Sequence, residues 1–241
     1  HEPQSVLGDS PASEAGPILA ALSAFGPLAA ADVAARCQDS EPQVRIWSAR
    51  LLGQLPAEVS VRVSLTCLED AVEDVRHAAM ASLRRLASVD SLRPLIQAGL
   101  AELVREGRDE RLRLAGAIAL GDLRHPIAVP MLIATLDTAD RELARVARAA
   151  LVTITCQDEG AERRRWEQWW NQNKSRHRIE WLIDALMHES AEARRTAGTE
   201  LKSLTKQYFG YYDDLPARER ARAQQRYRDW WDARGRLLHA Y

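Results

Sequence analysis

The chain has 241 residues and a formal net charge of −1, with 46% hydrophobic and 6% aromatic residues. This length allows one large domain or two small ones with a substantial core. The near-zero charge excludes a strong overall attraction to nucleic acid or to an anionic membrane surface. No apolar run reaches the roughly 20 residues that a membrane-spanning helix needs, so we expect no transmembrane segment.

Residues 1–16 are rich in Pro, Ser, Gly and acidic side chains and show no hydrophobic period. This composition predicts a disordered or loosely packed tail, followed by a folded region over residues 17–241. The chain begins at His1 rather than at Met. An export signal would therefore not be visible, and a cytoplasmic location is only slightly favoured over a periplasmic or exported one.

From residue 17 onward the apolar residues follow a helical period, and one pattern occurs five times. An aliphatic residue or Ala begins each copy, a small residue follows at +4, Leu at +8, and Leu or Ile at +11. These offsets lie on one face of a helix. The copies begin at Val44, Val75, Leu112, Leu143 and Ala193. An amphipathic segment precedes each copy, at residues 26–37, 59–70, 89–105, 127–137 and 176–188, which predicts five helical hairpins.

Two turns carry a more specific signature. "DSEPQVR" (39–45) and "DAVEDVR" (70–76) place an Asp five residues before the first aliphatic residue and an Arg directly after it. The pattern resembles HEAT repeats of the bacterial, PBS-lyase type. The resemblance implies an all-α solenoid, an αα superhelix, in which Asp and Arg form ladders between adjacent repeats. The implied ladder members are Asp39, Asp70, Arg45, Arg76, Arg113 and Arg194. We expect interruptions, because Ala144 replaces an Arg and the third and fifth repeats lack the Asp.

Two Trp-bearing segments, at about 158–174 and 208–238, follow the last two repeats at equivalent points. "ALVTITCQD" (150–158) aligns with "ELKSLTKQY" (200–208), and the second segment then contains an insertion with the run "YFGYY". Spacings of i, i+3 and i+4 place the aromatic residues on one helical face. The stripes are Trp166, Trp169 and Trp170, then Tyr227, Trp230 and Trp231. Packing against the solenoid is the favoured interpretation, and an exposed ligand box or a nucleic-acid stacking platform is the alternative.

The resemblance also indicates where a partner would bind, because the second helices line the concave side of a HEAT solenoid. Offsets +2, +6 and +9 point away from the hairpin core. They are apolar or small throughout the third repeat and at +6 and +9 of the fourth. A helix that is apolar all round needs a cover, from the chain itself or from a partner. The predicted partner-binding residues are Leu114, Ile118, Gly121, Ala149 and Val152, with Arg84 and Arg145 beside them.

No motif for catalysis, cofactor binding or metal binding is present. Glu180, Asp184 and His188 share a helical face, but an ordinary polar face is the favoured interpretation over a metal site. Cys37, Cys67 and Cys156 have no metal-site spacing and are expected to be buried free thiols.

We therefore expect a non-catalytic scaffold or adaptor that binds a protein or peptide. A HEAT-like enzyme of lyase or DNA-glycosylase type, and a structural domain of a larger assembly, are the alternatives. Nucleic acid is disfavoured as a partner, and the oligomeric state is left open.

Overall fold

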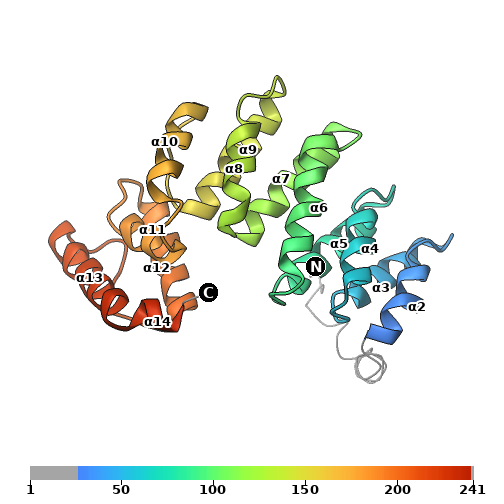
Figure 1. The fold of residues 1–241 in the computed structure, drawn as a ribbon, viewed down its shortest axis with the longest axis horizontal. Helices are drawn as coiled ribbons and strands as arrows, with labels where there is room; N and C mark the ends of the chain where they lie inside the picture. The colour runs from blue at the N-terminus through green and yellow to red at the C-terminus, as the bar shows by residue number, and fades with distance from the viewer. Residues whose placement is uncertain (1–26, 240–241) are drawn as a thin grey trace, which may run out of the picture. The chain divides into compact units, whose positions relative to one another are not determined.

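The computed structural model describes residues 27–239, and all regular secondary structure within them is helical (Figure 1). The expected tail at residues 1–16 lies outside the described residues. The chain divides into two compact units, residues 1–102 and 103–241. Within the described range no helix is both long and apolar enough to cross a membrane. Each unit is described by itself below.

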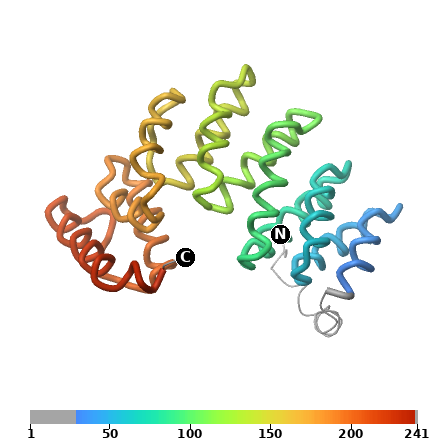
Figure 2. Tube along the Cα trace, in the orientation of Figure 1, coloured from blue at the N-terminus to red at the C-terminus, as the bar shows by residue number. Residues whose placement is uncertain are grey.

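The first unit is built from two helical hairpins and most of a further helix. The hairpins are α2–α3 and α4–α5, and successive hairpins stack so that α2 packs on α4 and α3 packs on α5. The chain trace can be followed from blue to cyan-green in Figure 2. The helices are α2 (Pro27–Arg36), α3 (Pro42–Leu52), α4 (Glu58–Cys67), α5 (Glu73–Leu86) and α6 (Arg93–Glu106), of which the last four residues belong to the second unit.

The second unit continues the same design and adds the Trp-bearing helices. Helix α8 pairs with α9, α11 pairs with α12, and α7 packs on α9. The elements are α7 (Glu110–Leu123), the 3-10 turn η1 (Pro126–Ala128), α8 (Val129–Thr135), α9 (Arg141–Thr155), α10 (Arg163–Asn173), α11 (Arg178–Ala185), α12 (Ala191–Thr205), α13 (Ala217–Trp230), the π-helical turn η2 (Trp231–Gly235) and α14 (Arg236–Leu238).

The repeated sequence pattern produces these helices as predicted. Every small residue at +4 and every Leu at +8 is buried, from Ser48 and Leu52 in α3 to Ala197 and Leu201 in α12. The small side chain lets the neighbouring helix approach, and the Leu fills the space beside it. At +11 the side chain is buried in three copies, half-buried at Leu123 and exposed at Leu204. The prediction of an all-α, solenoid-type fold made of helical hairpins is confirmed.

The arginine that follows the first aliphatic residue binds the turn before its own helix. In four repeats its Nη1 donates to the carbonyl oxygen six residues earlier, at distances of 2.8 to 3.2 Å. These carbonyls belong to turns that follow the first helix of each hairpin, where a cation also offsets the negative end of the helix dipole. The donors are Arg45, Arg76, Arg113 and Arg194.

Three of these arginines also reach an adjacent repeat or segment. Arg45 binds both carboxylate oxygens of Asp70 at 2.8 and 3.1 Å. Arg113 lies 3.6 Å from Asp140, the residue that caps α9 by accepting the N–H of Leu143. The sequence pattern overlooked Asp140, because it stands three residues before the first aliphatic residue instead of five. Arg194 donates to the backbone carbonyl of Asp213 in the aromatic insertion.

The two Trp-bearing helices occupy equivalent places. Helix α10 packs on α8, and α13 packs on α11, so each covers the first helix of the preceding hairpin. Each follows the same junction: the hydroxyls of Thr155 and Thr205 donate to the carbonyl four residues earlier and accept the N–H two residues later. Cys156 and Lys206 then end their helices in the left-handed conformation, at φ 54° and 56°. The alignment made from the sequence therefore matches the local geometry.

Candidate protein-interaction surface

The predicted partner-binding residues on α7 and α9 form an apolar face that is partly open to solvent. Ile118 is 49% exposed and is the most exposed large aliphatic side chain among these residues. Ala149 is also exposed, and Leu114 and Val152 are half-buried. Leu114, Ile118, Ala149 and Val152 are called the α7–α9 apolar face below.

Gly121 does not belong to this face, so its assignment as a partner-binding residue is wrong. It is buried, and a Cβ atom on it would come 2.9 Å from the Cβ of Ala150. Gly53 makes the same contact in the first unit, where a Cβ would come 2.8 Å from the Cα of Ser82. Offset +9 on one second helix thus packs against offset +7 on the next, and it does not point into solvent.

The two arginines predicted beside the site, Arg84 and Arg145, belong to different units of the chain. Arg145 is exposed and pairs with Glu142 on its own helix, through hydrogen bonds from its Nε and Nη2 atoms. Arg84 is also exposed but belongs to the first unit. Only Arg145 is therefore placed near the α7–α9 apolar face by the fold of the second unit.

A hollow of about 440 Å³ adjoins this face, beyond the open side of α9. Val152 and Thr153 line one side, and Ala193 and Thr196 at the start of α12 line another. Polar side chains also line the hollow, so its lining combines apolar and polar groups. The polar lining residues are Arg124, Gln157, Asp158, His188, Ser190 and Glu192. We call this space the α9–α12 hollow; the sequence pattern identified only Val152 among its lining residues.

The sequence explains why the hollow opens between α9 and α12. The close packing of second helices uses Gly at +9 and a small residue at +7, as in Gly121 and Ala150. Between α9 and α12, offset +9 of α9 is Val152 and offset +7 of α12 is Glu200. The close contact seen between α7 and α9 is therefore not repeated between α9 and α12. Glu200 instead binds Arg124 and Arg178, each at 2.7 Å. Val152 and the charged Glu200 thus prevent close packing of α12 on α9, and the hollow lies between these two helices.

The Trp stripes are predominantly packing elements. Trp166, Tyr227 and Trp231 are buried, and Trp169, Trp170 and Trp230 are partly buried. The first stripe meets Trp181 of α11, with ring centroids 5.2 Å from Trp169 and 6.0 Å from Trp170. Trp181 was not identified from the sequence as a member of this aromatic cluster. The indole N–H groups of the two buried tryptophans also have partners within the protein: Trp166 donates to the Gly160 carbonyl at 2.8 Å, and Trp231 donates to Glu180 at 3.0 Å.

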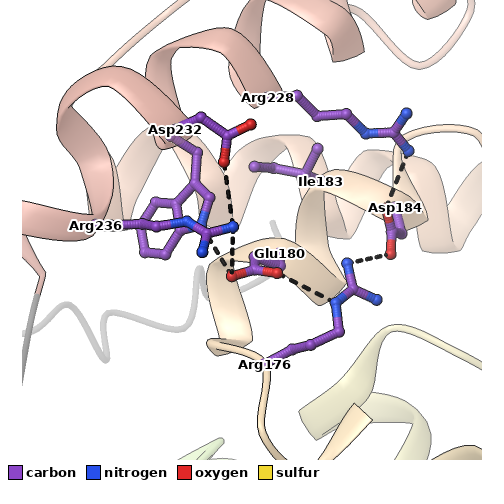
Figure 3. A pocket seen from close by; sticks show the side chains of 8 residues that line it. Arg176, Glu180, Ile183, Asp184, Arg228, Asp232 and Arg236 are labelled. Atoms are coloured by element: carbon purple, nitrogen blue, oxygen red, sulfur yellow. Dashed lines mark hydrogen bonds and ion pairs between the residues drawn. The ribbon is translucent and has the colours of Figure 1, made fainter. Parts of the chain in front are cut away.

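An ion-pair network fixes the C-terminal helices to α11 (Figure 3). Arg176 lies 3.2 Å from Glu180 and 2.7 Å from Asp184, and these carboxylates also meet Arg236 and Arg228 from α14 and α13. Figure 3 shows the charged side chains converging from two layers of helices. The carboxylates of Glu180 and Asp184 are therefore occupied by guanidinium groups. Among the described residues no group of His, Cys, Asp and Glu forms a candidate metal site.

The three cysteines are buried free thiols, as expected. Burial raises the pKa of Cys156 to about 11. The hydrogen bond that the Cys37 thiol donates to its neighbour Cys67, together with burial, raises the pKa of Cys37 well above its usual range. The same hydrogen bond lowers the pKa of Cys67. Neutral, buried thiols are poor nucleophiles, so the raised pKa values of Cys37 and Cys156 make these two thiols unreactive.

Comparison with known proteins places part of the chain in a repeat family. The sequence pattern of the PBS lyase HEAT-like repeat matches residues 112–138, which cover most of α7 and all of η1 and α8. No curated protein matches the chain. Among solved structures, Escherichia coli YibA is 15% identical; the alignment covers 97% of this chain and 94% of YibA, with a TM-score of 0.39. A structural likeness at this level carries no inference about function. The match at residues 112–138 and the repeated hairpins together support a HEAT-like repeat protein with an all-α, solenoid-type fold.

Proposed function

We propose that the protein is a non-catalytic scaffold that binds a protein or peptide through the α7–α9 apolar face and the α9–α12 hollow. The exposure of Ile118 carries this proposal. Ile118 is 49% exposed and lies in the apolar central stretch of α7, residues 114–121, so covering it with a partner is favourable in free energy. HEAT-like repeats are commonly protein-interaction modules, which agrees with this role.

The dimensions of the hollow support a peptide side chain as the group that is bound. A volume of about 440 Å³ lies in the range of pockets that hold small ligands or single side chains. Val152, Ala193 and Thr196 would contact the apolar part of an inserted side chain. The Glu192 carboxylate would accept a backbone N–H group of the partner, whereas the Asp158 carboxylate is held by Arg148. Such a mixture of apolar and polar groups is typical of protein interfaces.

The enzymatic alternatives receive less support from the site. A glycosylase-like mechanism would need aromatic side chains that are exposed beside a carboxylate, so that an unstacked base could bind. The Trp166 and Trp231 rings are instead buried against neighbouring helices. Trp231 does approach a carboxylate, but its Nε1 donates to Glu180 at 3.0 Å within the ion-pair network. We therefore assign the aromatic stripes to packing and the exposed apolar face to binding.

The proposal is tested by comparing three immobilised baits in native lysate: wild type, Ile118→Asp and Ile127→Asp. Ile127 is a matched control, because it is 59% exposed and lies in the same unit but on η1. Quantitative mass spectrometry should find proteins that wild type and Ile127→Asp retain and that Ile118→Asp loses. Circular dichroism should give the same melting curve for all three.

Two results would contradict the proposal. The first is a set of retained proteins that is the same for all three baits, which would show that Ile118 contributes nothing to binding. The second is the unfolding of Ile118→Asp at a clearly lower temperature, which would mean that the face is part of the core. A structural role within an assembly of identical chains would appear instead as a multiple of the 27.0 kDa chain mass in light scattering.

A further inference from the structure

A second exposed surface in the second unit combines aromatic rings with cationic side chains. It is formed by the end of α12, the insertion that follows it, and one face of α13. Its members are Lys202, Lys206, Tyr208, Tyr212, Arg222 and Arg226, all of them exposed. We call it the basic–aromatic surface.

The aromatic part is an exposed pair of tyrosines. Tyr208 is 46% exposed and Tyr212 is 60% exposed, and their rings meet edge to face with centroids 6.0 Å apart. The Lys202 ammonium lies 5.2 Å from the Tyr208 ring centre, as in a cation–π contact. Tyr211 of the same insertion is instead buried, and its hydroxyl donates to the Leu186 carbonyl. Tyr208 and Tyr212 therefore remain free to contact a partner.

The cationic part is a helical stripe without carboxylate partners. Arg218, Arg222 and Arg226 recur at i, i+4 and i+8 on α13, and within the described residues none of them forms an ion pair. The Arg226 guanidinium lies beside Gly210, which joins the stripe to the insertion. The nearby carboxylate of Asp213 is already paired with Arg195 at 3.2 Å.

This stripe is unfavourable for the isolated helix. Like charges at i, i+4 repel one another. Arg218 also lies in the first turn of α13, where the positive end of the helix dipole disfavours a cation. An anionic ligand would relieve both effects. Arg228 and Arg236 on the opposite side of the same helical segment show the contrast, because each has a carboxylate partner.

We propose that the basic–aromatic surface binds an acidic segment of a partner protein. Carboxylates would pair with Arg222, Arg226 and Lys206, while an apolar or aromatic side chain of the segment would pack on Tyr208 and Tyr212. The inference rests on the proposed protein-binding function and adds a second contact of defined chemistry. Single-stranded nucleic acid shares some of this chemistry, but the chain's net charge of −1 gives no long-range attraction to a polynucleotide.

The test uses the full chain and a fluorescein-labelled peptide of sequence EEFEEFEE, measured by fluorescence anisotropy at low ionic strength. We expect Arg222→Ala/Arg226→Ala and Tyr208→Ala/Tyr212→Ala each to weaken binding by about tenfold. The matched control is Arg85→Ala/Arg141→Ala, which removes the same charge from exposed positions elsewhere. The control should bind the peptide within about twofold of wild type, and Ile118→Asp should bind it unchanged.

Three results would overturn the inference. Equal weakening by the control variant would show attraction to overall charge only. Unchanged binding by the tyrosine variant would remove the aromatic contact. Tighter binding of the oligonucleotide dT12, lost in the same two variants, would make nucleic acid the occupant. None of these three results would change which lysate proteins the wild-type and Ile118→Asp baits retain. The proposed function is therefore tested independently of this inference.

Discussion

Gly121 on α7 lies directly against Ala150 on α9, where a Cβ on the glycine would come 2.9 Å from the Cβ of Ala150. Gly53 and Ser82 repeat this relationship between α3 and α5, and there the Ser82 hydroxyl also donates to the Ala49 carbonyl at 2.5 Å. Two second helices thus approach most closely where neither carries a large side chain. This contact determines which offsets of the repeat are buried and which remain available to a partner.

Gly121→Ala should destabilise the second unit, although Ala is the better helix former. The helix-propensity gain is about 1 kcal/mol, and we expect overpacking against the α9 backbone to exceed it and leave a net loss of about 1–2 kcal/mol. Urea unfolding followed by circular dichroism measures the change. The double variant Gly121→Ala/Ala150→Gly should recover part of the loss, since it restores the space. A stability at or above wild type for the single variant would refute the close-contact explanation.

Trp166→Ala should be among the most damaging single substitutions in the second unit. The ring is fully buried between α10 and its neighbours, and its N–H binds the Gly160 carbonyl. Loss of such a side chain costs about 3–5 kcal/mol. Trp47, which is 43% exposed and stacks only with Arg50, is the control, and Trp47→Ala should cost less than about 1 kcal/mol. Similar losses in both variants would mean that Trp166 is not a core residue.

Glu200→Gln should destabilise the protein because it leaves Arg178 charged and buried. Arg178 is 8% exposed, its Nη1 binds Glu200 at 2.7 Å, and its Nε donates to the Ile154 carbonyl. Breaking a buried pair in this way costs about 3 kcal/mol. Glu167→Gln breaks the exposed pair with Arg163 and should cost less than about 0.5 kcal/mol. The variant Arg178→Met/Glu200→Met, which removes both charges, should be more stable than Glu200→Gln in thermal melts.

The Arg45–Asp70 pair predicts an acid dependence for the first unit. The hydrogen bond from Arg45 lowers the pKa of Asp70 below its usual value. The ionised form is therefore favoured by folding. Its contribution to stability is fully present above the unfolded pKa of about 3.9 and is lost as pH falls through the lower folded pKa.

Melting temperatures measured between about pH 2.5 and pH 7 should therefore fall less steeply on the acid side for Asp70→Asn than for wild type. That variant should also be less stable at neutral pH. Asp74→Asn, at an exposed position four residues away, is the control and should follow the wild-type curve. Parallel curves for Asp70→Asn and wild type would show that the pair contributes no pH-dependent stability.

The repeat pattern predicted the helices because it depends on the spacing of residues within a single helix. An apolar residue at zero, a small residue at +4 and Leu at +8 occupy one face of a single helix, so their spacing is visible in the sequence. The equivalence of the two Trp segments was visible for the same reason, since Thr155 and Thr205 form their junctions within a few residues. The turn arginines follow this rule as well, because Arg45 binds a carbonyl only six residues away.

The binding surfaces depend on contacts between residues that are distant in sequence. The sequence alone gave offset +9 the same expected role in Gly121 and Val152. The tertiary structure separates them: Gly121 is covered by Ala150, whereas Val152 lines the hollow where Glu200 replaces a small residue. The sequence by itself determined the order and approximate position of the helices and the main face that each one buries, because the apolar spacing that sets them lies within one helix. Only the tertiary structure decided which remaining faces stay open, because that depends on the partner helix that each offset meets.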